Sequence, residues 1–201
     1  MEPGSGFDME ADTTEEFFKL RPGFYKKLHY GAGCVNFLVL LIITISPYWL
    51  GYSAEENNFT MGVWTYCFQK KCGLVSARSV YLFLVRALLI IAIGCGLTAL
   101  ITSWTSFSHC LKENTDKAMM SFVTNFIAAI CMLTALVIIY TKLRTSVDDA
   151  VLLSPCQDFF LGCFVFVLFF ALATVNLWWY MHLVSAQKKA ATQITPAEEA
   201  P

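Results

Sequence analysis

Four long apolar segments constrain this chain more than any other feature of its sequence. A helix needs roughly 20 mainly apolar residues to cross the hydrocarbon core of a bilayer. At 57% hydrophobic residues, the chain is also more apolar than soluble domains, in which about 45–50% is usual. We therefore predict an all-α membrane protein with one four-helix domain, residues 31–184. Its predicted spans cover about residues 31–50, 80–107, 118–140 and 158–184.

The segments outside these spans predict the topology. Residues 1–30 are acidic and then basic, 51–79 and 141–157 are predicted outer loops, and 185–201 form a short polar tail. No signal peptide is expected, because the first apolar segment begins only near residue 31. Eight basic residues lie on the predicted inner side: Lys19, Arg21, Lys26, Lys27, Lys112, Lys117, Lys188 and Lys189. Six lie on the outer side: Lys70, Lys71, Arg78, Arg86, Lys142 and Arg144. This bias predicts that both termini lie in the cytoplasm. We expect a multi-pass protein of the plasma membrane.

The first outer loop has a strand-like pattern that contains two cysteines. Residues 62–68 are rich in aromatic and β-prone residues, 69–71 form a predicted turn, and 72–75 return as a second strand. Cys67 and Cys72 would then face each other across neighbouring strands, close enough for a disulfide. Cys156, in the second outer loop, is the alternative partner for either. Asn58 begins an Asn-Phe-Thr glycosylation sequon, and because a glycan is added only on the lumenal side, the sequon fits an outer position of this loop.

The ends of the spans also carry residues expected at membrane interfaces. Pro47 lies near the outer end of the first span, and Tyr48 and Trp49 follow at the depth of the lipid headgroups. Arg86 lies at the outer headgroup edge, where its long side chain can reach water. Cys110, beside the membrane on the inner side, is a candidate for palmitoylation, with an unmodified reduced thiol as the alternative.

Several of these residues form a pattern that resembles the claudin superfamily. The superfamily includes claudins, peripheral myelin and epithelial membrane proteins, and calcium-channel gamma subunits. The matching residues are Trp49, Gly62, Trp64, Cys67, Cys72 and Arg86. The resemblance implies a four-helix bundle with a small extracellular antiparallel β-sheet made by the outer loops. For Trp64, it implies a residue that anchors the loop on the lipid surface or the bundle top; simple packing on the loop's own sheet is the alternative.

Three asparagines lie within the predicted spans, each one to two helical turns from the inner end. Asn36, Asn125 and Asn176 could therefore meet at one depth. A polar group in hydrocarbon is costly unless it is paired, so we interpret the three as an interhelical polar cluster that joins the spans. A binding site is the alternative, although no charged partner lies at that depth.

The sequence contains no pattern typical of an enzyme, a metal site or a cofactor site. The three histidines are far apart, the cysteines lack zinc spacing, and no phosphate-binding loop or nucleophile–base motif occurs. The net charge of −1 argues against a nucleic-acid partner. The expected partners are the lipid bilayer and other membrane proteins, whether a channel, a receptor or a second copy.

Three functions remain open at this point. We expect a non-enzymatic auxiliary or organising subunit that associates laterally with other membrane proteins. The alternative is a claudin-like protein of cell–cell adhesion or of a paracellular barrier. A transporter or channel is disfavoured, because the spans lack charged residues away from their ends. Direct binding to a PDZ domain is not expected, because the chain ends in Pro201, which lacks the backbone donor used in strand addition.

Overall fold

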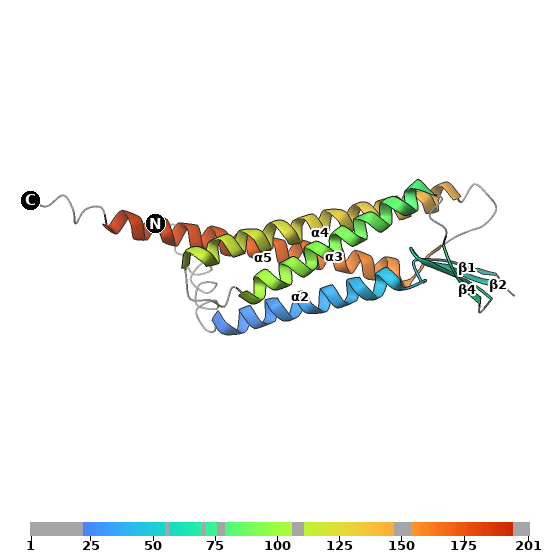
Figure 1. Ribbon diagram of the computed structural model, residues 1–201, viewed down its shortest axis with the longest axis horizontal. Helices are drawn as coiled ribbons and strands as arrows, with labels where there is room; N and C mark the ends of the chain where they lie inside the picture. The colour runs from blue at the N-terminus through green and yellow to red at the C-terminus, as the bar shows by residue number, and fades with distance from the viewer. Residues whose placement is uncertain are drawn as a thin grey trace, which may run out of the picture.

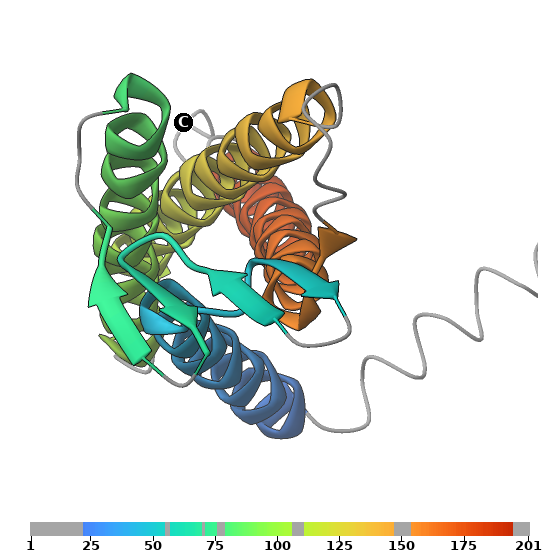
Figure 2. The ribbon, with the colours of Figure 1, turned by 90° about the vertical axis from the view of Figure 1, so that its right-hand side faces the viewer.

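A computed structural model describes residues 22–54, 57–69, 71–75, 79–105, 111–146 and 154–194. Four long helices form a bundle, and a small sheet lies across one end of it (Figures 1 and 2). The helices are α2 (Pro22–Ile45), α3 (Val80–Thr105), α4 (Leu111–Ser146) and α5 (Gln157–Ile194). The strands are β1 (Leu50–Ala54), β2 (Asn57–Met61), β3 (Thr65–Phe68), β4 (Lys71–Leu74) and β5 (Ser154–Pro155). The predicted fold class, a four-helix membrane bundle with a small antiparallel sheet, is confirmed.

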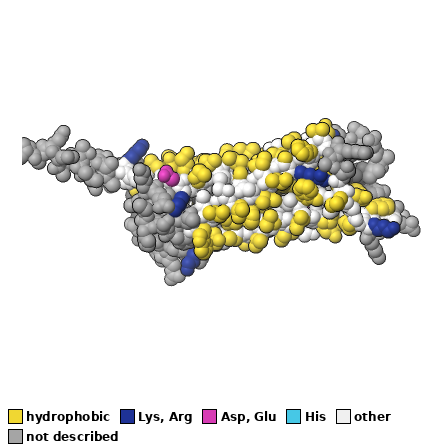
Figure 3. Space-filling model, in the orientation of Figure 1, with side chains coloured by type: hydrophobic (Ala, Val, Ile, Leu, Met, Phe, Trp, Pro, Cys, Tyr) yellow, Lys and Arg dark blue, Asp and Glu magenta, His cyan; other side chains and the backbone are white. Residues whose placement is uncertain are grey.

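All four helices are long and apolar enough to cross a membrane. The qualifying segments are Lys27–Ile45, Val80–Trp104, Thr115–Lys142 and Gln157–Lys188. Large apolar side chains such as Leu38, Ile90 and Val167 are exposed along the helices. Exposing them to water would be unfavourable, whereas contact with lipid tails would not. Figure 3 shows this apolar surface along the bundle, with Lys and Arg side chains near its two ends.

The helix bounds differ from the predicted spans in two ways. Helix α2 ends at Ile45, before the predicted boundary at residue 50, because Pro47 cannot donate a helical hydrogen bond and restricts the residue before it. Helix α2 begins at Pro22, before the predicted start at residue 31, helix α4 extends beyond residues 118–140 at both ends, and helix α5 extends beyond residue 184 to Ile194. Their additional turns are polar, so hydropathy alone could not include them.

The sheet joins both predicted outer loops. Its strand order is β4-β3-β2-β1-β5, and every neighbouring pair is antiparallel. Strands β3 and β4 confirm the predicted hairpin, although residues 62–64 belong to the loop before β3 and not to the strand. Strands β1 and β2 were not predicted. In the end-on view of Figure 2, the sheet crosses from β4 near α3 to β5 near α5.

One hydrophobic core connects the bundle to the sheet. Its fully buried side chains include Leu40 and Ile43 of α2, Leu89 of α3, Met132 of α4 and Val165 of α5. Val63 and Trp49, which lie outside the helices, belong to the same cluster. The sheet therefore rests on the bundle through shared core residues and is not merely tethered to it.

Candidate functional site

Trp49 is a core residue, which corrects its predicted position in the headgroup layer. Its side chain is only 1% exposed. The indole Nε1–H donates to the carbonyl oxygen of Ile43 at 2.6 Å, which satisfies one of the open carbonyls at the end of α2. Tyr48, in contrast, is 54% exposed and fits the interfacial prediction. Trp49 thus caps the first span and fills the space beneath the sheet.

Gly62 permits the close approach of the loop to the end of α2. A Cβ atom at this position would lie 2.2 Å from the carbonyl oxygen of Ser46 and 2.7 Å from Cα of Pro47. Any larger residue would therefore push the loop away from the helix end. The Gly62 N–H also donates to the carbonyl of Thr65 at 2.8 Å, which closes the turn that leads into β3.

Arg86 binds the loop from α3, and this role differs from the predicted extension toward lipid headgroups. Its Nε donates to the Val63 carbonyl at 3.0 Å and its Nη2 to the Val75 carbonyl at 2.7 Å. The guanidinium also lies 4.6 Å from the centre of the Trp64 ring, within the range of a cation–π contact. Trp64 itself is partly buried against the core. We call Trp49, Gly62, Trp64 and Arg86 the seat of the sheet.

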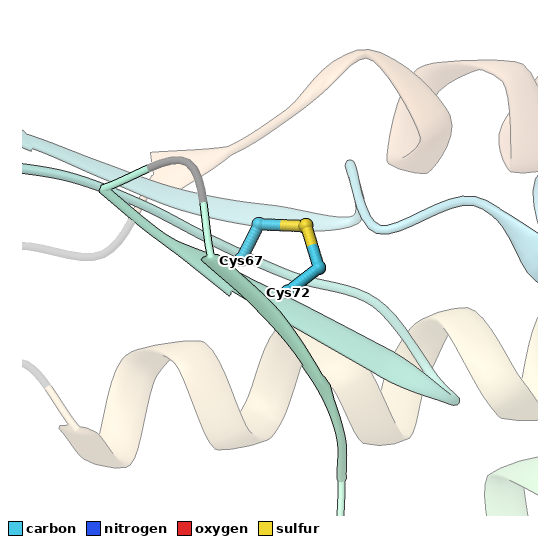
Figure 4. The surroundings of a disulfide bond; sticks show 2 residues. All are labelled: Cys67 and Cys72. Carbon is cyan, nitrogen blue, oxygen red and sulfur yellow. A yellow bond between two sulfur atoms is a disulfide. The ribbon is translucent and has the colours of Figure 1, made fainter.

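The predicted disulfide between Cys67 and Cys72 is confirmed. The two residues are direct partners on β3 and β4, with Cα atoms 4.1 Å apart (Figure 4). Gln69, in the turn between them, has a φ of 44°, which places it in the left-handed region that tight hairpin turns require. Cys156, the alternative partner, has a free thiol. Burial, and to a lesser degree the negative charge of Asp158, raises the pKa of this thiol.

Asp158 is a structural residue that the sequence did not single out. It is 5% exposed in the first turn of α5, and its Oδ2 accepts a hydrogen bond from the Tyr48 N–H at 3.0 Å. The Asp158 N–H donates in return to the Tyr48 carbonyl at 3.1 Å, and the Cys156 N–H donates to the Trp49 carbonyl. These hydrogen bonds connect the segment that follows the first span with the start of the fourth span.

The sheet presents aromatic side chains on one face. Phe68 is 45% exposed and Tyr66 is 39% exposed on β3, and Phe59 lies beside them on β2. The Phe59 and Tyr66 rings have centroids 6.4 Å apart, and the Tyr66 ring covers Gly73 on β4. We call Phe59, Tyr66 and Phe68 the aromatic face. The alternation of exposed and half-buried residues along β3 produces it.

The structure gives the backbone position of one of the two candidate modification sites. Asn58 lies on β2, where its backbone is opposite Ser53 of β1. Cys110 lies outside the described residues. Glycosylation of the first and palmitoylation of the second therefore stay predictions.

The three asparagines are all buried, but a serine is the centre of their polar contacts. Asn176 Nδ2 donates to Ser121 Oγ at 3.0 Å, and Asn125 Nδ2 donates to the Ser121 carbonyl at 2.8 Å. Ser121 Oγ also lies 3.4 Å from Ser103 Oγ on α3. These contacts join α3, α4 and α5, whereas both amide atoms of Asn36 on α2 are buried without a partner among the described residues. Ser121 was missed because serine is common in apolar helices and gives no periodic signal.

Within the described part of the chain, no group of three or more His, Cys, Asp or Glu side chains is arranged to hold a metal ion. His29 and His182 lie on α2 and α5, and His182 packs against the Trp179 ring with centroids 6.3 Å apart. The polar contacts of the seat and of the Ser121 cluster are structural hydrogen bonds. The site is therefore the aromatic face of the sheet, which the seat fixes to the helix bundle.

Comparison with known proteins supports the membrane assignment and leaves the family open. No protein-family model matches the chain. The human protein Transmembrane protein 225B is 27% identical over 140 residues. The match covers 66% of this chain and 63% of that protein, so this chain spans less than two thirds of its relative's length. Together with the four apolar helices, this similarity identifies the chain as a multi-pass membrane protein.

Proposed function

We propose that this protein is a non-enzymatic plasma-membrane protein that associates laterally with other membrane proteins as an auxiliary or organising subunit. The observation that carries this proposal is the aromatic face, which is exposed on a sheet held firmly to the bundle. Exposed aromatic residues are enriched where proteins bind one another, because they bury a large area with little loss of conformational freedom. The proposed topology places this face outside the cell, with both termini inside.

The seat explains why the face can act as a binding surface. A binding surface that is already ordered avoids the entropy loss of ordering a loop when the partner arrives. Arg86 and Trp49 connect the sheet to two different helices, and the disulfide closes the β3–β4 hairpin. The partner is therefore expected to meet a preformed surface.

The test is chemical cross-linking in intact cells, followed by purification in mild detergent. Replacing Tyr66 and Phe68 together with serine should abolish the partner cross-links, while the lost ring contacts within the sheet should cost only about 0.2–1 kcal/mol each. Tyr48→Ser is the matched control, because Tyr48 is also an exposed aromatic residue at this end of the bundle but lies outside the sheet. Equal cross-linking by the double variant and the wild-type protein would contradict the proposal.

A second candidate is claudin-like adhesion or barrier formation between cells. It is favoured by the position of the sheet, which lies at the end of the bundle and extends past it (Figure 1). It is also supported by the seat, because the residues that resemble the claudin superfamily meet there. In this case the protein should concentrate at contacts between two expressing cells and be absent from contacts with non-expressing cells. Even distribution over the whole surface would argue for lateral association.

A further inference from the structure

A small cavity lies within the bundle, toward the end opposite the sheet. It is lined by His29 and Gly33 of α2, Ser103 of α3, Asn125 of α4 and Leu172 of α5. Its volume is about 10 Å³, which is close to the space that one water molecule occupies. The lining combines polar groups from three helices with apolar side chains, so a water there would find hydrogen-bonding partners.

Two side chains on this part of α2 carry buried polar atoms that lack a partner among the described residues, although His29 also forms a hydrogen bond with the Leu172 backbone. The unpaired atoms are Nε2 of His29 and both Nδ2 and Oδ1 of Asn36. Asn36 is 0% exposed, and it lies three residues from the cavity-lining Gly33, on the same side of α2. Buried polar groups in folded proteins are almost always hydrogen-bonded to protein or to ordered water. Three unpaired atoms on one helix therefore indicate solvent.

The packing around α2 explains why direct contacts do not satisfy these atoms. Gly33 of α2 and Gly96 of α3 both line the cavity and contribute no side chain to fill it. The Ser121 contacts join α3, α4 and α5 but do not include α2. Helix α2 packs mainly on α3 and α5, and His29 bonds to the Leu172 backbone of α5 and not to a side chain of this cluster.

We propose that ordered water joins this half of α2 to the rest of the bundle. One water occupies the cavity, which His29, Ser103 and Asn125 line, and the Asn36 amide, one turn further along α2, is hydrated from this same site. The Ser121 contacts and this hydration site together connect all four helices.

Hydroxyl-radical footprinting with mass spectrometry tests this directly, because radicals formed from a bound water oxidise the side chains beside it. Phe169 and Leu172 line the cavity and are 2% and 8% exposed, so bulk solvent hardly reaches them. Both should be oxidised in the purified full-length protein. Met132 is the internal control, because it is 0% exposed in the apolar core and its thioether is the more reactive group. Unmodified Phe169 and Leu172, or labelling of Met132 to the same extent, would overturn the proposal.

A second measurement uses Asn36→Leu, which replaces the amide by two methyl groups and keeps the branching at Cγ. If water satisfies the amide, its removal loses those hydrogen bonds and the melting temperature in detergent falls. If the amide is dry and unpaired, the leucine relieves a desolvation cost and the melting temperature rises. A rise would therefore refute the proposal. Thr98→Val is the matched control, because its hydroxyl is exposed and bonds only to Gly94 of its own helix.

Discussion

Removing the guanidinium of Arg86 should release the sheet from the bundle. In Arg86→Met, the Val63 and Val75 carbonyls lose their charged donor, and the Trp64 ring loses its cation. A hydrogen bond to a charged group contributes about 1.5–3 kcal/mol, and an exposed cation–π contact about 0.5–1 kcal/mol. Because these groups are only partly buried, we take the lower values, which give about 3–4 kcal/mol for the whole contact.

The appropriate assay is hydrogen–deuterium exchange of residues 62–75 in detergent micelles. The reporting amides are Gly62 N–H, bonded to Thr65, and Val75 N–H, bonded to Trp64. At roughly 1.4 kcal/mol per tenfold, their exchange should accelerate by at least about a hundredfold. The helical amides around Met132 should keep the wild-type rate, because the change is local.

Two further variants make this test specific. Arg86→Lys keeps the charge but has no planar fork to reach both carbonyls, so its exchange should lie between the two extremes. Lys142→Met is the matched control, because Lys142 also lies over an aromatic ring, Tyr81, but connects α4 to α3. Wild-type exchange of residues 62–75 in Arg86→Met would show that the apolar core alone holds the sheet.

Three other predictions concern the sheet and its neighbours. Asn58→Gln should abolish the gel shift that a glycosidase produces; an unshifted wild-type protein at the cell surface would contradict use of this sequon. Cys67→Ser should cost about 2 kcal/mol and make Cys72 reactive to thiol reagents, and a silent Cys72 would count against the pairing. Alkylation of Cys156 should require a higher pH in the folded than in the unfolded protein, because its thiol pKa is raised. The corresponding stability is present below the unfolded pKa and is lost as pH rises through the folded pKa; identical pH profiles would refute it.

The sequence predicted the features that depend on local patterns. Long apolar segments identify spans because a bilayer demands them wherever they occur. The Cys67–Cys72 hairpin was predictable because the strand pattern, the turn and both cysteines lie within a few residues. Strands β1 and β2 were missed because residues 50–54 and 57–61 contain few β-branched residues and gain their stability from neighbouring strands.

The roles of Trp49 and Arg86 depend on tertiary packing, which explains why the sequence misplaced them. Position along the chain put both residues at the membrane interface, where their chemistry is common. In the structure, α2 ends early, and its Ile43 carbonyl accepts a hydrogen bond from Trp49. The loop returns over α3, where its carbonyls accept hydrogen bonds from Arg86. A backbone carbonyl that is buried without a partner costs free energy, which favours its bond to a donor within reach.

Different interactions stabilise the two ends of the bundle: mainly apolar packing at the sheet end, and polar contacts at the opposite end. This difference bears on function. At the sheet end, Trp49, Val63 and Leu40 form dry packing, and Asp158 bonds the first span's exit to the fourth span's entry. At the other end, polar contacts through Ser121 and unpaired atoms on α2 replace part of that packing. Apolar packing resists small displacements, whereas hydrogen bonds through water can rearrange with little cost. A partner that binds the aromatic face would therefore meet a rigid surface, while any adjustment of α2 would occur at the far end.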